Sequence, residues 1–216
     1  MGRNITVSGE AAQKKNVTTA PPEMKKASLG KMQIKYPSGD VYTGAVKNGV
    51  PEGKGVYRYA SGREYNGRFK DGKFCGKGVM KMPDGTTYKG EWVDGRQNGR
   101  FTVSYADGGK YKGEMSDGRL CGFGVYCSPG DDFYEGQWQD GQPNGKGKRV
   151  MPNGDIYDGD FVFGRYHGKG VLKMRDGTRY DGVWQNGDMH GVFNVTDALG
   201  RERVEEYRFG KLMKKQ

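Results

Sequence analysis

Residues 65–87 read YNGRFKDGKFCGKGVMKMPDGTT, and this 23-residue unit decides the fold. Tyr65 is followed at alternate positions by Gly67 and Phe69, and then by the pair Asp71-Gly72. Side chains two residues apart lie on one face of a strand, so the rings and the glycine should share a side. An Asp-Gly pair supplies the positive φ angles of a tight turn. The unit therefore predicts a β-hairpin.

The unit recurs seven times with constant spacing. Each copy opens on a tyrosine, namely Tyr42, Tyr65, Tyr88, Tyr111, Tyr134, Tyr157 and Tyr180. Four positions later comes a bulky apolar residue, namely Val46, Phe69, Trp92, Met115, Trp138, Phe161 and Trp184. Repeats of this length pack only against their neighbours in sequence. The predicted fold is therefore all-β, an elongated single-layer antiparallel meander of hairpins that forms a twisted rod.

The two faces of such a sheet should differ in chemistry. A glycine between the tyrosine and the apolar residue leaves room for rings to lie over the backbone, which gives one face paved with aromatic side chains. The other face should carry lysines of second strands, such as Lys77 and Lys81, beside acids of first strands, such as Glu91 and Glu114. Opposite charges on adjoining strands suit a solvated surface.

The chain divides by pattern into four segments. Residues 1–29 are predicted to be a disordered basic arm, and residues 30–41 a half-repeat that caps the first hairpin. Residues 42–200 hold the seven repeats, and residues 201–216 form a C-terminal cap and basic tail.

The last segment leaves its own conformation open. Tyr207 follows Tyr180 by 27 residues, four more than the period. Residues 201–216 could be a strand after a longer loop or a short helix, and either would cover the open sheet edge.

The formal net charge of +10 lies largely at the ends. Residues 1–29 carry +3, residues 201–216 carry +3 and the 171 residues between them carry only +4. This distribution argues against nucleic acid as the partner, because such modules usually gather their basic groups on one face. It leaves contact of the tails with phosphoinositides or another anionic membrane surface as an alternative function.

The sequence offers little for membrane anchoring or secretion. It has no apolar stretch of membrane-spanning length and no apolar leader, and its three cysteines form no disulfide framework. A cytoplasmic location is therefore expected. Gly2 fits the loose N-myristoylation pattern, although arginine directly after the glycine is disfavoured.

Metal, cofactor and catalytic chemistry have no residues to support them. Cys75 and Cys121 are two repeats apart and should lie ~20 Å from each other, and His167 and His190 should lie about 10 Å apart. Zinc ligands must converge much more closely. The recurring Gly-Lys-Gly lacks the spacing of a phosphate-binding loop, and no nucleophile stands beside a base. We therefore predict no cofactor and no enzymatic activity.

The repeat resembles a known family. The stretches YKGEWVDGRQNG at 88–99 and YEGQWQDGQPNGKG at 134–147 are similar to the MORN (membrane occupation and recognition nexus) repeat, and the likeness covers residues 42–191. The resemblance implies a scaffold, often in ciliary or flagellar axonemes, in other cytoskeletal assemblies or at membrane junctions. It also implies a partner, a helix or an extended segment, in an aromatic groove. Phosphoinositide binding has been proposed for several members.

The predicted groove consists of Tyr65, Phe69, Tyr88, Trp92, Tyr111, Tyr134, Trp138, Arg149, Tyr157, Phe161, Tyr180 and Trp184. Arg149 stands where other repeats carry Tyr57 or Met80, and it could be either a partner contact or a frayed position. Phe101 stands where other repeats have the second glycine of Gly-Lys-Gly, which is a further departure from the pattern.

Overall fold

The computed structural model describes residues 4–6 and 30–215, which form strands and turns and no helix. The predicted all-β class is thereby confirmed. The chain divides into two compact units, residues 1–96 and 97–216, and each is described by itself. Apart from Asn4–Thr6, the predicted N-terminal arm lies outside the described residues. No helix in the described part of the chain could span a membrane.

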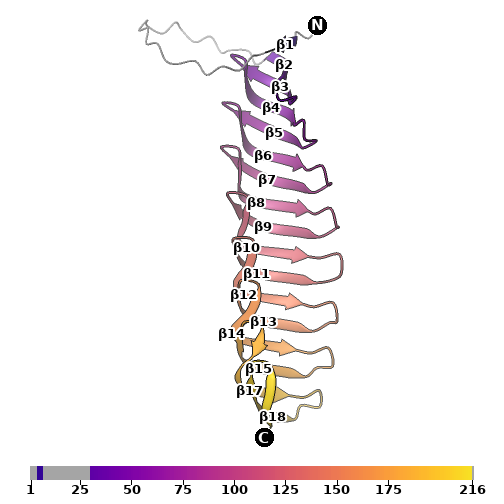
Figure 1. Ribbon diagram of the computed structural model, residues 1–216, viewed down its shortest axis with the longest axis vertical. Helices are drawn as coiled ribbons and strands as arrows, with labels where there is room; N and C mark the ends of the chain where they lie inside the picture. The colour runs from indigo at the N-terminus through magenta and orange to yellow at the C-terminus, as the bar shows by residue number, and fades with distance from the viewer. Residues whose placement is uncertain (1–3, 7–29, 216) are drawn as a thin grey trace, which may run out of the picture. The chain divides into compact units, whose positions relative to one another are not determined.

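The first unit is a meander in which neighbours in sequence are neighbours in the sheet (Figure 1). Its strands are β1 (Asn4–Thr6), β2 (Gly30–Lys35), β3 (Val41–Lys47), β4 (Val50–Arg58), β5 (Glu64–Lys70), β6 (Lys73–Lys81) and β7 (Thr87–Val93). β1 is parallel to β2, and from β2 to β7 every pairing is antiparallel. Each predicted repeat in this unit is thus one hairpin.

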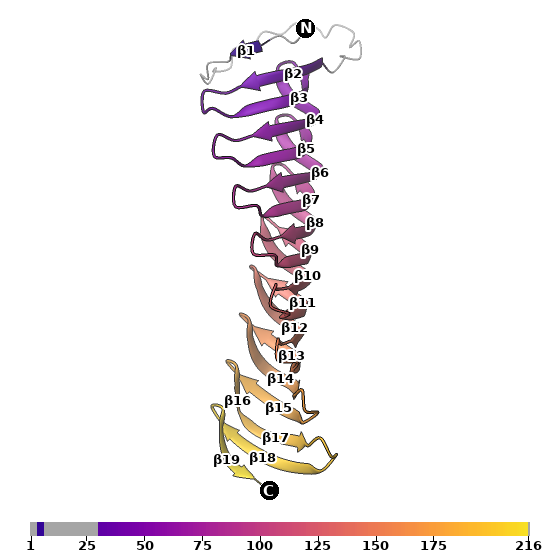
Figure 2. The ribbon, with the colours of Figure 1, turned by 90° about the vertical axis from the view of Figure 1, so that its right-hand side faces the viewer.

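The second unit continues the same construction (Figure 2). Its strands are β8 (Arg96–Ser104), β9 (Lys110–Ser116), β10 (Arg119–Cys127), β11 (Phe133–Gln139), β12 (Gln142–Val150), β13 (Ile156–Val162), β14 (Arg165–Lys173), β15 (Arg179–Gln185), β16 (Asp188–Met189), β17 (Gly191–Thr196), β18 (Glu202–Arg208) and β19 (Lys211–Lys215). The strand pairings described within it are antiparallel, and β15 pairs with both β16 and β17.

The short turns have the predicted geometry. Asp71 and Gly72 both have positive φ, 49° and 77°, as a type I′ turn requires. The amide of Gly72 also donates to the carbonyl of Pro51 in the preceding hairpin at 3.0 Å, which ties adjacent repeats together. The same conformation is imposed on Phe163 and Phe209, with φ of 47° and 48°, although bulky side chains rarely adopt it.

The C-terminal segment is a pair of strands, β18 and β19, rather than a helix. The register also corrects the spacing argument from the sequence. Tyr207 pairs with Gly191 just as Trp184 pairs with Gly168, so Tyr207 fills the position of the apolar residue and not that of the tyrosine. Arg203 occupies the tyrosine position, and the 23-residue period continues unbroken into an eighth, degenerate unit.

Candidate functional site: the ring face

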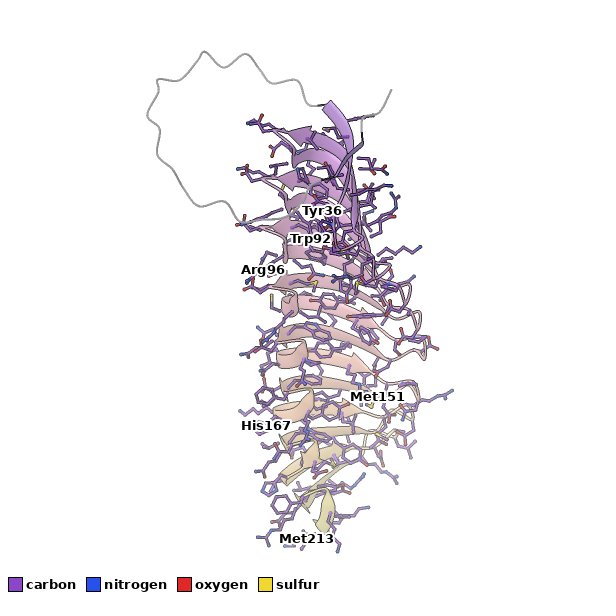
Figure 3. The ribbon with its side chains drawn as sticks, turned by 45° about the horizontal axis from the view of Figure 1, so that its top comes forward. Tyr36, Trp92, Arg96, Met151, His167 and Met213 are labelled. Carbon is purple, nitrogen blue, oxygen red and sulfur yellow. The ribbon has the colours of Figure 1, made fainter. Side chains whose placement is uncertain are left out.

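Side chains project from both surfaces of the sheet in each unit (Figure 3). We call the surface that carries the repeat tyrosines and glycines the ring face, and the opposite surface the charged face. The period of two along each strand places them on opposite sides. Because the ring face holds most buried apolar side chains, its layers decide what a partner could touch.

The repeat tyrosines form a buried inner layer. Tyr42, Tyr65, Tyr111 and Tyr157 are 0% exposed and Tyr134 is 4% exposed. The hydroxyl group of each donates to the carbonyl oxygen three residues further on; from Tyr157 to Asp160 the distance is 3.1 Å. A β-bulge interrupts the ladder at this point, so the hydroxyl group satisfies an irregular stretch of backbone. Burial raises the pKa of Tyr134 to about 12.

Paired glycines make room for these rings. Gly159 and Gly170 lie opposite each other on β13 and β14, and the ring of Tyr157 lies directly over them. A Cβ atom added at Gly170 would overlap the Tyr157 hydroxyl group. The repeated glycines are therefore required by ring packing.

The tryptophans complete the inner layer. Trp138 lies edge-on to Tyr111 and Tyr134, with ring centroids 5.3 and 5.2 Å apart. Its indole N–H donates to the carbonyl oxygen of Gly124 at 3.0 Å, and Trp184 donates to Gly170 at 3.1 Å. Edge-to-face packing and a satisfied N–H group make these rings a stable core, with no polar group left over for a partner.

A second layer of side chains covers the tyrosines. Phe74 stacks on Tyr65 with centroids 3.8 Å apart, and Tyr166 stacks on Tyr157 with centroids 3.7 Å apart. Both outer rings are half-buried. The same repeat position carries Pro51, Gln97, Leu120, Pro143 and Met189 in the other hairpins, where Pro51 is buried and the rest are half-buried. These side chains form an outer layer, one residue per repeat, that is apolar except at Gln97 and meets solvent except at Pro51.

The predicted groove residues therefore fall into two classes. Tyr65, Phe69, Trp92, Tyr111, Tyr134, Trp138, Tyr157, Phe161 and Trp184 belong to the buried inner layer. Tyr88, Arg149 and Tyr180 are half-buried. Sequence reasoning missed Phe74 and Tyr166. The residue type at this position changes from repeat to repeat, although the alternation of sides along the strand places the position on the ring face. The part played by all these residues in binding a partner stays a prediction.

The repeat match decides the family. The model of the MORN repeat matches residues 42–62, 65–87, 88–110, 111–132, 134–156, 157–179 and 180–192. The chain belongs to the MORN-repeat family. No curated protein matches it.

Two solved structures are similar to the MORN-repeat chain at low sequence identity. The TCP10 domain of Danio rerio CPAP, in complex with a peptide of Danio rerio STIL, matches with a TM-score of 0.51 and 13% identity, over 86% of this chain and 83% of that one. The SAS-4 (dCPAP) TCP domain of Drosophila melanogaster, in complex with a proline-rich motif of Ana2, matches with a TM-score of 0.47 and 13% identity, over 88% of this chain and 99% of that one.

The third and seventh MORN repeats depart from the others, because Phe101 and Phe193 stand where the second glycine should be and the repeat tyrosine is only half-buried. Phe193 replaces the second glycine, and its ring fills the space over Gly182, where a Cβ atom would come within 2.6 Å of it. Tyr180 is correspondingly half-buried rather than fully buried. The amide of His190 donates to the Val183 carbonyl at 2.9 Å, the group that a tyrosine hydroxyl would otherwise reach. Phe193 therefore leaves Tyr180 half-buried at a position where most repeats bury the tyrosine fully.

Arg149 has a partner within its own MORN array. Its guanidinium group donates two hydrogen bonds to Asp132, at 2.9 and 2.7 Å. Tyr57, at the same position in the first repeat, donates to Asp40 at 2.8 Å. The Asp132 bonds raise the pKa of Arg149, while burial opposes that shift. Arg149 thus joins the end of its hairpin to the preceding loop.

The cysteines and histidines considered as metal-binding or reactive residues do not come together in one site. Cys121 lines a recess of about 420 Å³ beside Asp117, Arg119 and Asp140, and burial raises the pKa of its thiol. The Nδ1 atoms of His167 and His190 are buried without a hydrogen-bond partner. Across the described MORN repeats, no group of three or more His, Cys, Asp or Glu residues is placed to hold a metal ion.

Proposed function

We propose that this MORN-repeat protein is a non-enzymatic scaffold that binds an extended segment of a partner protein on its ring face. The outer layer is the observation that carries the proposal. Phe74 and Tyr166 are half-exposed rings that the buried tyrosines beneath them hold in place. A ring that is already ordered loses little conformational entropy when a partner covers it, and aromatic side chains are frequent binding hot spots.

The spacing of the outer layer suits an extended chain. Equivalent positions in neighbouring repeats are two strands apart, about 10 Å. An extended polypeptide rises about 3.3 Å per residue, so every third residue would meet the next outer side chain. The Danio rerio TCP10 domain, which shares the fold, is in complex with a peptide, and this supports a ligand of the same kind.

Family membership supports a cytoskeletal setting for the scaffold. We place it in an assembly such as the ciliary or flagellar axoneme, because MORN-repeat proteins often act as scaffolds there. Proximity labelling in the native cell tests the setting. Enrichment of axonemal or other cytoskeletal neighbours is the expected result. A set of neighbours without such proteins would overturn the proposed location, and the binding face is tested separately.

Site-specific photo-crosslinking tests the face itself. A benzophenone amino acid is placed at Tyr166 on the ring face and, as the matched control, at Lys146 on the charged face of the preceding repeat. We expect the first to crosslink one partner segment and the second to yield none. The crosslinked segment, made as a peptide, should bind at least about tenfold more weakly to Tyr166→Ala than to the wild type. Equal crosslinking from both positions would contradict the proposal.

A further inference from the structure

The charged face of the first unit is strongly basic. Residues 30–96 carry 13 lysines and arginines against seven acids, a net charge of +6, whereas residues 97–215 carry 18 against 17. Lys31, Lys54, Arg68 and Lys77 are all exposed on this face, on strands β2, β4, β5 and β6. The excess therefore lies on one surface of one unit rather than being spread over the repeats.

Like charges face each other there in register. Lys54 lies directly opposite Arg68, and Lys70 lies directly opposite Lys73. Directly opposed like charges destabilise a sheet. Among the described residues, neither Lys54 nor Arg68 has a carboxylate within salt-bridge distance.

At the equivalent positions, repeats of the second unit carry opposite charges. Four repeats after Lys54 and Arg68 stand Lys146 and Asp160, which form a salt bridge of 2.8 Å. Two repeats after Lys54 and Arg68, Arg100 lies opposite Glu114. The repeat therefore accommodates an acid opposite the basic residue, as it also does one repeat later at Lys77 and Glu91, whereas Lys54 and Arg68 forgo the pairing at a cost in stability. A ligand that supplies negative charge would explain that cost.

We propose that the charged face of β4–β6 binds an acidic segment of a partner protein. The surface favours a polypeptide over other polyanions. Among residues 30–96 its exposed large apolar side chains are only Val50 and Val93, so it offers no aromatic platform on which single-stranded bases could stack. It equally lacks the aromatic or leucine side chains that insert into a bilayer.

The geometry sets the pattern of the acidic segment. Lys54 and Arg68 lie on adjacent strands, about 5 Å apart, and Lys31 lies two strands from Lys54, about 10 Å away. A chain that crosses the strands presents side chains of one side every 6–7 Å. Carboxylates at every second or third residue would therefore meet Lys31, Lys54, Arg68 and Lys77 in turn.

Fluorescence anisotropy on the full chain tests the proposal with a labelled probe peptide, (Glu-Glu-Ala) repeated four times. The key variant is Lys54→Glu, which weakens the basic surface while creating an opposite-charge pair with Arg68. We expect it to lower probe affinity at least about fivefold and yet raise the thermal midpoint by about 1–2 °C. The matched control is Lys146→Glu in the second unit, which should change probe affinity less than about twofold.

Several results would overturn the inference. Equal loss of affinity in Lys54→Glu and Lys146→Glu would mean that only net charge matters. No measurable probe binding at 50 mM salt would exclude the site. Tighter binding, under the same conditions, to a single-stranded oligonucleotide or to vesicles containing phosphatidylserine would assign the face to that ligand instead. Tyr166→Ala should leave probe affinity unchanged, which separates this face from the ring face.

Discussion

Tyr166 lies flat on Tyr157, with ring centroids 3.7 Å apart and ring planes 10° from parallel. Only Tyr157 is fully buried, whereas Tyr166 keeps one side open to solvent. The two rings come from adjacent strands of one hairpin. The Tyr157 ring belongs to the buried layer that stabilises the sheet, and the Tyr166 ring belongs to the outer layer that forms its surface. This division can be tested one residue at a time.

Removing the two rings should have unequal effects on stability. Tyr157→Ala deletes a fully buried ring and should lower the free energy of unfolding by ~3–5 kcal/mol. Tyr166→Ala should cost ~1 kcal/mol because half of its surface already meets water. Urea unfolding followed by tryptophan fluorescence measures both values. Equal losses would mean that the two layers are not distinct.

A methyl group added to one of the paired glycines under a tyrosine ring should lower the free energy of unfolding nearly as much as loss of the ring. Gly170→Ala forces the Tyr157 hydroxyl group off its position, and we expect a loss of ~2–3 kcal/mol from overpacking. Gly30 provides the control, since a Cβ atom there meets nothing within 4 Å. Gly30→Ala should change the free energy of unfolding by less than ~0.5 kcal/mol, and a similar change in both variants would contradict the packing argument.

Tyr180 should be chemically more accessible than the core tyrosines. In the folded protein, tetranitromethane should nitrate Tyr180 much faster than Tyr157, as measured by mass spectrometry of peptides. Phe193→Gly restores the glycine that most other repeats carry and should let the Tyr180 ring turn inward, which would slow its nitration. Unchanged reactivity of Tyr180 in this variant would show that Phe193 does not hold the ring out.

Alkaline pH should unfold the protein. Burial raises the pKa of Tyr42 and Tyr134 to about 12, above the ordinary value of 10.0. Above pH 10 the unfolded chain releases tyrosine protons that the folded chain retains, so the free energy of unfolding falls as pH rises. Absorbance at 295 nm should show these tyrosines ionising only together with loss of the circular dichroism signal of the sheet. Ionisation of all tyrosines in the folded protein would refute their burial.

Acid should weaken the last repeat through Glu205. This carboxylate is 3% exposed; burial opposes its ionisation, but hydrogen bonds from Tyr207 and Arg203, both 2.6 Å long, outweigh burial and lower its pKa. Its contribution is complete above the ordinary value of 4.5 and is lost as pH falls through the lowered pKa. Glu205→Gln should therefore show a smaller drop in thermal midpoint between pH 7 and pH 3 than the wild type.

The strands, turns and faces could be predicted because each depends on near neighbours in sequence. Asp71-Gly72 encodes its own turn, and the alternation from Tyr65 to Phe69 encodes a face. The eighth unit was harder to see, because Arg203 and Glu205 replace the tyrosine and glycine that mark the others. Only the pairing of Tyr207 with Gly191 shows that the period continues.

The sequence by itself determined the period, the hairpins and the residues that share the ring face, since a strict repeat of 23 admits one alternation of sides. Tertiary structure decided which of those rings remain accessible. Burial depends on what lies across the sheet: Phe74 covers Tyr65, paired glycines admit Tyr157, and Phe193 takes the place that Tyr180 would fill. Such contacts join residues on different strands, and a pattern along one strand does not contain them.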